Sequence, residues 1–242
     1  MLDPITIERI TPGGIPTLQV SPRGAVDPLP TVLLYHGWVG KKENQQIAAE
    51  ALACAGFRVL APDLPRHGER GPFPDYGAPE AWNSFWDVVA QAIEEVPLLL
   101  RVAGEAPIGV AGNSTGGMVA GGALARYPSM KASVILNSCL CFEWLDRRGG
   151  NAPPLEGARL VRLRSFDPEA LVEKMAPRPV LLLHGAADTT LPVAGARRFV
   201  ERARPYYLPH PANLTLTEVP GLDHWVTAGM VGAMRDWFLR HL

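Results

Sequence analysis

Short apolar runs alternate with stretches of helical periodicity along most of the chain. Residues 30–35 and 57–61 are apolar runs rich in large and β-branched side chains, and both are expected to be buried strands. Between them, residues 41–55 carry apolar side chains at helical spacing and stop at Gly56, a typical position for a helix C-cap. This part of the sequence therefore predicts a strand, helix, strand unit.

The same alternation continues to the end of the chain. It predicts strands over residues 108–111, 132–137, 180–184 and 214–219, and helices over residues 79–100, 115–126, 193–203 and 226–239. The strands are apolar on both faces, which is typical of a parallel sheet covered by helices on each side. Residues 5–10 and 17–20 flank a Pro-Gly-Gly turn and predict a hairpin of antiparallel edge strands. We expect one α/β domain over residues 1–242, with a mainly parallel central sheet flanked by helices.

Two stretches interrupt the alternation. Residues 66–79 are rich in proline and glycine, which predicts a long surface loop. Residues 140–178 contain aromatic side chains, a Gly-Gly-Asn turn, a Pro-Pro pair and a predicted short helix over residues 168–175. A segment of about 40 residues is marginal as an independent core. We therefore interpret residues 140–178 as a small cap or lid inserted between two core strands.

Composition narrows the class of protein. The 242 residues include 23 Lys and Arg against 24 Asp and Glu, and no basic run of the kind that binds phosphates, so nucleic acid is not expected as a partner. The sequence shows neither the basic and apolar regions of a signal peptide nor a long apolar run, so we expect a cytoplasmic protein without membrane contact. Cys54, Cys139 and Cys141 form no even disulfide set and no CxxC pair, which favours buried free thiols in a reducing compartment.

One glycine-rich turn carries candidate chemistry. Gly112-Asn113-Ser114-Thr115-Gly116 lies where a predicted strand gives way to a predicted helix. A nucleophilic serine on such a turn needs glycine two residues away on each side, because side chains there would clash. The amide of Thr115 and the start of the helix would then face developing negative charge. Alternatively, the glycines allow close helix packing or hold a phosphate, but no GxGxxG or GxxxxGK sequence accompanies them. Asn113 receives no role.

A serine nucleophile needs a histidine base and a carboxylate that orients it. His224 follows the strand over residues 214–219, and Asp188 follows the strand over residues 180–184. Both are therefore expected at the same edge of a parallel sheet as Ser114. Asp223 competes with Asp188, although a residue next to the histidine rarely folds back onto its ring. The order Ser114, Asp188, His224 is the order of an α/β-hydrolase triad.

Several segments together carry a resemblance to a known family. These are LLYHGWVGKKEN, GFRVLAPDLPRHGER, GNSTGG, PVLLLHGAADTTLPVAGARRF and PGLDHW. They resemble the α/β-hydrolase superfamily, specifically its small esterases and dienelactone-hydrolase-like members, over residues 31–242 and least clearly in residues 140–178. The resemblance implies that Trp38 donates its backbone N–H to an oxyanion hole beside Thr115, with Gly37 as the alternative. Dienelactone hydrolases carry a cysteine where this chain has Ser114, which favours ordinary ester chemistry.

Specificity is expected to reside in loops above the carboxyl edge of the sheet. The candidates for an apolar substrate pocket are Trp38, Phe142, Trp144 and Leu145. Three aromatic residues at helical spacing, Trp82, Phe85 and Trp86, either add a wall to this pocket or pack in the core. Three arginines near the cap, Arg159, Arg162 and Arg164, either favour an acidic substrate or form a solvated face.

The sequence as a whole predicts a carboxylesterase acting on small to medium acyl esters, as a monomer or a homodimer. No cofactor or metal is expected, since His36, His67 and His184 lack a spacing typical of metal ligands. A peptidase, thioesterase or lactone hydrolase would use the same triad. A non-catalytic binding protein on a hydrolase scaffold is the remaining alternative, and the intact triad argues against it.

Overall fold

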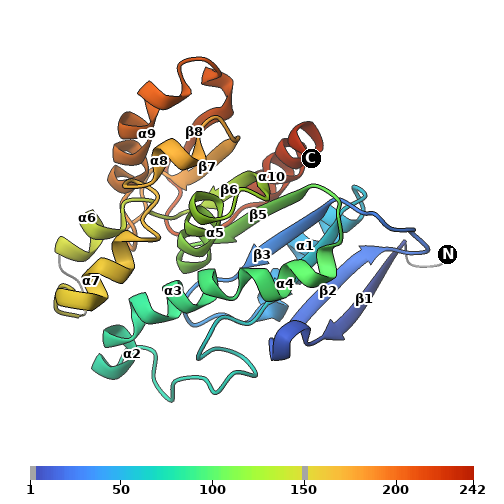
Figure 1. Ribbon diagram of the computed structural model, residues 1–242, viewed down its shortest axis with the longest axis horizontal. Coiled ribbons are helices and arrows are strands. Elements are labelled where there is room, and N and C mark those ends of the chain that lie inside the picture. The colour runs from blue at the N-terminus through green and yellow to red at the C-terminus, as the bar shows by residue number, and fades with distance from the viewer. Residues whose placement is uncertain (1–3, 149–151) are drawn as a thin grey trace.

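One eight-stranded sheet forms the centre of the described part of the protein (Figure 1). The computed structural model describes residues 4–148 and 152–242. The strand order is β1-β2-β4-β3-β5-β6-β7-β8, in which β2 runs antiparallel to β1 and β4 and the remaining pairs are parallel. The strands are β1 (Ile5–Ile10), β2 (Thr17–Pro22), β3 (Thr31–Tyr35), β4 (Arg58–Pro62), β5 (Ile108–Asn113), β6 (Met130–Leu136), β7 (Val180–Gly185) and β8 (Leu214–Val219). The prediction of a mainly parallel sheet with an N-terminal edge hairpin is confirmed.

The central strands are largely apolar because both faces of the sheet are covered. In β3, Leu33 and Tyr35 join the core on one side of the sheet, and Val32 and Leu34 join the core on the other. Successive side chains of a strand point to opposite faces, so a strand buried on both sides reads as a continuous apolar run. The prediction of buried strands follows directly from this arrangement.

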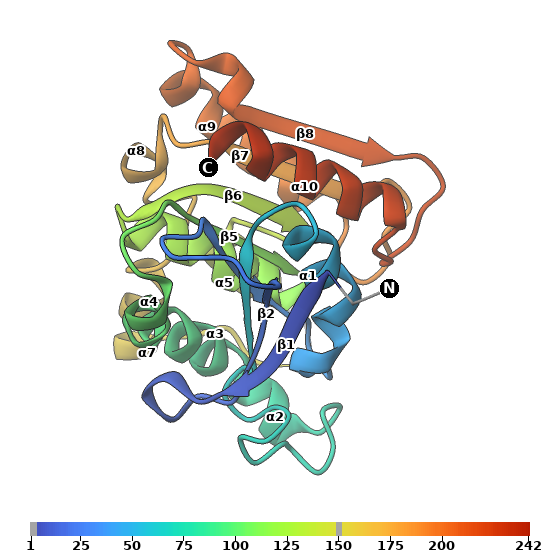
Figure 2. The same cartoon turned by 90° about the vertical axis from the view of Figure 1, so that its right-hand side faces the viewer.

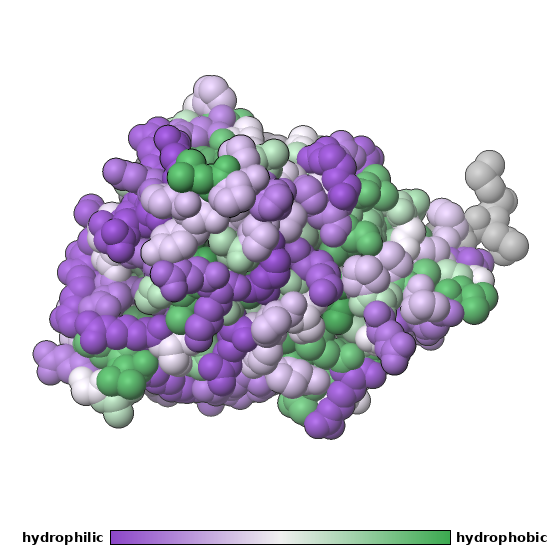
Figure 3. Space-filling view, turned by 45° about the horizontal axis from the view of Figure 1, so that its top comes forward, coloured by the Kyte–Doolittle hydropathy of each residue, from purple (hydrophilic) through white to green (hydrophobic). Residues whose placement is uncertain are grey.

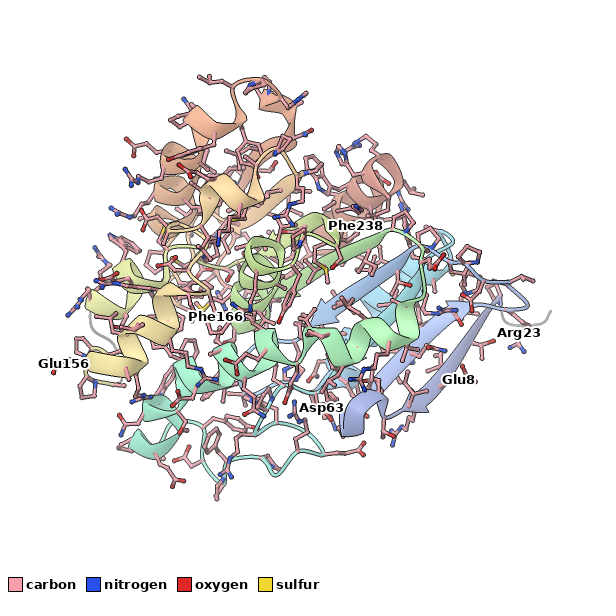
Figure 4. All side chains as sticks on the ribbon, viewed as in Figure 1. Glu8, Arg23, Asp63, Glu156, Phe166 and Phe238 are labelled. Carbon is pink, nitrogen blue, oxygen red and sulfur yellow. The ribbon has the colours of Figure 1, made fainter. Side chains whose placement is uncertain are left out.

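Helices cover the sheet on both sides (Figures 1 and 2). The α-helices are α1 (Gln46–Ala53), α2 (Pro79–Asn83), α3 (Phe85–Glu94), α4 (Val96–Ala103), α5 (Thr115–Arg126), α6 (Phe142–Arg147), α7 (Gly157–Arg164), α8 (Val172–Met175), α9 (Ala194–Tyr207) and α10 (Ala228–His241). Buried side chains of α3, α4, α5 and α9 share the core that contains Leu33. Those of α1 and α10, including Phe238 (Figure 4), share the core that contains Val32. The sheet is therefore the middle of three layers.

The predicted helix over residues 79–100 is three helices, so that prediction was wrong in its continuity. Ser84 separates α2 from α3, and its hydroxyl bonds the carbonyl of Glu80, a local bond that competes with regular helix. Glu95 separates α3 from α4, whose second residue is Pro97. Proline lacks the N–H that would continue the hydrogen bonds of the preceding helix. Apolar residues recur at helical spacing through all three helices, so the sequence alone predicts a single helix.

The chain between β6 and β7, residues 137–179, contains more helix than the sequence indicated. It holds α6, α7 and α8, and α8 spans only Val172–Met175 of the helix predicted over residues 168–175. The Gly-Gly-Asn turn expected here lies outside the described residues. The carboxylate of Asp167 accepts hydrogen bonds from the amides of Phe142 and Glu143 at the start of α6. Burial raises the pKa of Asp167 to about 6.

None of the described helices is long and apolar enough to cross a membrane. On the face shown in Figure 3, hydrophobic side chains are scattered among hydrophilic ones. All three cysteines are free, and Cys139 and Cys141 are buried whereas Cys54 is exposed. The expectation of buried thiols is therefore correct for two of the three.

Candidate active site

Ser114 occupies a strained turn between β5 and α5. Its backbone has φ 55° and ψ −121°, a region that residues other than glycine rarely adopt. A Cβ atom at Gly112 would lie 2.2 Å from the carbonyl oxygen of Gly116, and one at Gly116 would lie 2.3 Å from that of Tyr35. The hydroxyl of Ser138 donates to the carbonyl of Ser114 at 2.6 Å. The two glycines thus let the backbone close tightly around the serine.

This close approach gives a stability prediction. We expect Gly116→Ala to lower the free energy of unfolding by at least about 2 kcal/mol, because the new methyl group meets backbone that cannot move aside. Gly232→Ala is the matched control: Gly232 lies within α10, and apart from its own helix backbone and its chain neighbours no atom of the described residues lies within 4 Å of the added methyl. Alanine there should stabilise by up to about 1 kcal/mol. Urea unfolding measures both, and equal effects of the two changes would contradict the packing argument.

Asp188 and His224 form a hydrogen-bonded pair. Nδ1 of His224 lies 2.7 Å from Oδ2 of Asp188, whose carboxylate is fully buried. The other carboxylate oxygen accepts hydrogen bonds from the amides of Thr190 and Leu191 at 2.9 and 2.8 Å. Since a carboxylate only accepts hydrogen bonds, Nδ1 of His224 carries the proton. In the neutral imidazole of this tautomer, Nε2 of His224 carries no proton and can act as a base.

The competing acid, Asp223, has a different set of partners. Its carboxylate accepts hydrogen bonds from the amide and the hydroxyl of Thr189, at 2.8 and 3.0 Å to Oδ1. The bond from the Thr189 amide is the main cause of a pKa below the usual value for Asp223. Asp223 therefore ties the loop after β8 to the turn after β7, while Asp188 contacts the imidazole.

Two further side chains, Asn137 and His184, help to hold this pair. Neither was predicted from the sequence to belong to the site. Asn137 follows β6 and is fully buried. Its Oδ1 accepts from the amide of Gly185, and its Nδ2 donates to the carbonyl of Trp225, next to His224. Nε2 of His184 lies 3.2 Å from Oδ2 of Asp188, and burial lowers the pKa of this histidine. A polar residue at the end of a buried strand was the available signal for Asn137.

The loop after β3, which contains Trp38, is fixed by buried polar side chains. Nδ1 of His36 donates to the carbonyl of Gly37 at 2.8 Å, and Nε2 accepts from the amide of Leu64 at 3.0 Å. Nζ of Lys42 lies 2.9 Å from Oδ2 of Asp63, and both side chains are almost completely buried. The first and last residues of this loop are therefore anchored to the chain that follows β4.

The neutral state of His36 gives a pH prediction. Burial lowers its pKa from 6.5 to about 4, so its contribution to stability is fully present above pH 6.5 and is lost as the pH falls from 6.5 to about 4. This contribution is about 3 kcal/mol. Urea unfolding of wild type and His36→Gln across this interval measures it. The wild type should lose more stability than the variant, and parallel losses would contradict the assignment.

A pocket of about 510 Å³ opens at the carboxyl edge of the sheet, beside Ser114 and His224. Its walls are mainly apolar and come from the loop after β3, from α2 and α3, and from the chain between β6 and β7. The lining residues are Trp38, Val39, Trp82, Asn83, Phe85, Trp86, Ser114, Thr115, Met118, Leu145, Asp146, Ala152, Pro153, Leu155, Arg159, Thr190, Leu191 and His224. The structure thus brings the predicted nucleophile, base and both oxyanion candidates to one cavity.

The predicted pocket side chains divide into two groups. Trp38 and Leu145 line the cavity, whereas Phe142 is fully buried, with its ring 5.3 Å from that of Trp86. Trp144 lies under the guanidinium of Arg148 at 4.7 Å. Trp144 lies about 100° around the helix from Leu145, whereas Phe142, one turn earlier on a similar side, packs against Trp86 in the core. Of these three residues of α6, Leu145 is the one that lines the cavity, together with the adjacent Asp146.

For the aromatic residues of α2 and α3 and for the arginines of α7, the sequence left two roles open, and the structure shows where these side chains lie. The aromatic residues of α2 and α3 (Trp82, Phe85 and Trp86) line the pocket. The arginines of α7 pair with acidic side chains: Arg159 with Asp87, Arg162 with Asp87 and Glu94, and Arg164 with Glu143. Of the three, Arg159 also lines the pocket. Within residues 4–148 and 152–242, no group of three or more His, Cys, Asp or Glu is arranged to hold a metal ion.

Comparison with known proteins extends over nearly the whole chain. A sequence family described as the alpha/beta hydrolase fold matches residues 30–178. The protein named Putative esterase YitV, from Bacillus subtilis, is 31% identical, with 98% of this chain and 100% of YitV covered. Esterase YjfP from Escherichia coli is 30% identical, with 98% and 100% covered. The crystal structure of TT1662 from Thermus thermophilus has a TM-score of 0.80 and 27% identity, with 98% of this chain and 97% of that chain covered.

Proposed function

The chain belongs to the α/β hydrolase fold family, and from this premise we propose that it is a serine carboxylesterase that cleaves esters of small to medium acyl chain. The observation that carries the proposal is the 2.7 Å bond between His224 and Asp188, in a pocket that His224 shares with Ser114. A buried carboxylate, an oriented imidazole and a serine on a strained turn are the three parts of an acyl-transfer site. The two relatives named as esterases support the same class of reaction.

In the proposed mechanism, Oγ of Ser114 attacks the ester carbonyl carbon and gives its proton to Nε2 of His224. The tetrahedral oxyanion accepts hydrogen bonds from the backbone amides of Trp38 and Thr115. The ester C–O bond then breaks, and His224 returns the proton to the leaving alcohol. Water, deprotonated by His224, hydrolyses the acyl-enzyme and regenerates Ser114. Each oxyanion donor contributes roughly 3 kcal/mol to transition-state stabilisation.

We further propose that residues 140–178 act as a cap on a single domain. Leu145, Asp146 and Leu155 supply one wall of the pocket. The ion pairs of Arg159 and Arg162 with Asp87 link α7 to α3. Excluding water from the reacting centre strengthens its electrostatic interactions, which is the use expected of such a cap.

A panel of substrates tests the reaction class. We expect p-nitrophenyl esters of short and medium acyl chains to be hydrolysed with a higher kcat/KM than the matching thioesters, anilides and lactones, and we expect activity to fall for long chains that exceed the pocket. Ser114→Ala serves as the blank for each substrate. A larger kcat/KM for thioesters, anilides or lactones would transfer the proposal to that class.

A further inference from the structure

A buried carboxylate faces the substrate pocket without belonging to the proposed triad. Asp146 is on α6, is 9% exposed and lines the same cavity as Ser114. Its Oδ1 accepts a hydrogen bond from the indole Nε1 of Trp86 at 3.0 Å, and its Oδ2 accepts from the amide of Leu155 at 2.9 Å. Burying a carboxylate in an apolar wall costs free energy unless hydrogen bonds compensate it. These two bonds therefore hold the Asp146 carboxylate in the wall of the pocket.

The carboxylate of Asp146 can accept more hydrogen bonds than these. A carboxylate offers about four lone-pair positions, and two donors come from the described residues. The other charged residue that lines the pocket near α6, Arg159, already donates to Asp87 and to the carbonyl of Asn83. Among the described residues that line the pocket, Asp146 supplies the one carboxylate, so it can accept a hydrogen bond from a donor on a bound molecule.

A run of aromatic rings connects the loop after β3, which contains Trp38, to Asp146. The ring of Trp38 lies 5.2 Å from that of Phe85, and the ring of Phe85 lies 5.1 Å from that of Trp86. Trp86 in turn donates to Asp146. Trp82, stacked 5.5 Å from Trp38, widens the same wall. Aromatic surfaces of this kind favour a planar ring, which gains offset-stacked or edge-to-face contacts.

From this arrangement we propose that the pocket selects esters that carry an aromatic ring with a hydrogen-bond donor, a hydroxyl or an ammonium group, at the end remote from the ester. The ring packs along Trp38, Phe85 and Trp86, and Asp146 accepts the donor. The proposal rests on the proposed function and specifies its substrate class. Hydrogen bonds to charged groups contribute more than neutral ones, so the selectivity for a donor is expected to be tenfold or more.

The test compares methyl esters of phenylpropanoic acid that differ only at the para position: hydroxy, aminomethyl, methoxy and unsubstituted. For the wild type, kcat/KM should be about tenfold or more higher for a donor-bearing ester than for the methoxy ester. The hydroxy and aminomethyl esters distinguish a neutral from a cationic donor. In Asp146→Leu the ratio of donor to methoxy should fall close to one, and in Asp146→Asn it should lie between. Because the readout is a ratio, a loss of folded enzyme cancels.

Arg159→Gln is the matched control, since it changes the other charged lining residue and should leave the ratio unchanged. A wild-type ratio near one, or a ratio that both Asp146 variants preserve, would overturn the proposal. Binding to Ser114→Ala, followed through tryptophan fluorescence, separates the two levels. If the esters bind with the donor preference but are not hydrolysed by the wild type, the proposed function fails and the Asp146 site stands. If the wild type hydrolyses the esters without that preference, the proposed function stands and the Asp146 site fails.

Discussion

Replacing Ser114 with alanine is expected to lower kcat for a chromogenic ester by roughly 10⁴- to 10⁶-fold, with KM little changed. The hydroxyl oxygen, Oγ, is the only heavy atom removed, and the proposed mechanism needs it to form the acyl-enzyme. The strained backbone of residue 114, with φ 55°, is set by Gly112 and Gly116, so the turn should persist in the variant. Steady-state kinetics with p-nitrophenyl esters measures the effect.

Ser133→Ala is the matched control for this prediction. Ser133 is a buried serine of β6, and its hydroxyl has no hydrogen-bond partner among the described residues. Its removal should leave kcat within about twofold of the wild type, because replacing this hydroxyl with hydrogen breaks no hydrogen bond. If Ser114→Ala retained activity comparable to Ser133→Ala, the nucleophile would have to be another residue.

Asp188→Asn is expected to lower kcat by about 10⁴-fold. One carboxylate oxygen of Asp188 is held by the amides of Thr190 and Leu191, so the asparagine oxygen should occupy that position. Its NH₂ group would then face Nδ1 of His224, at the site where the carboxylate oxygen now lies at 2.7 Å. A donor there favours the tautomer with the proton on Nε2, which cannot accept the proton of Ser114.

Asp223→Asn separates the two acids. Its carboxylate bonds Thr189 and is not used as a proton acceptor in the mechanism, so kcat should fall by about tenfold or less. Both variants are measured with the same ester at the same pH. A severe loss in Asp223→Asn together with a mild loss in Asp188→Asn would assign the orienting acid to Asp223.

Most of the sheet and the three proposed triad positions could be read from the sequence for one physical reason. Ser114, Asp188 and His224 each follow a strand, and the carboxyl ends of parallel strands meet at one edge. The central strands were visible because burial on both faces makes their composition largely apolar, whereas β8, at the edge of the sheet, is only partly buried. For these residues, the local sequence pattern therefore also indicates where they lie in the fold.

The pocket could not be read in the same way. Whether Phe142, Trp144 or Leu145 lines the cavity depends on the placement of α6, a short helix in a segment whose described residues form no strand. Asn137 gains its meaning only from Gly185 and Trp225, residues far away in the sequence that the fold brings to its amide. Trp86 carries the same aromatic signal whether it lines a cavity or fills the core, since it does both.

Covalent trapping tests the central claim, that Ser114 is the nucleophile, most directly. The protein is treated with a fluorophosphonate, and the modified residue is identified by mass spectrometry of the intact chain and of its peptides. We predict one adduct per chain, on the peptide that contains Ser114, with loss of ester hydrolysis in proportion to labelling and no adduct in Ser114→Ala. An adduct on another residue, or full hydrolysis by a chain labelled at Ser114, would contradict the account.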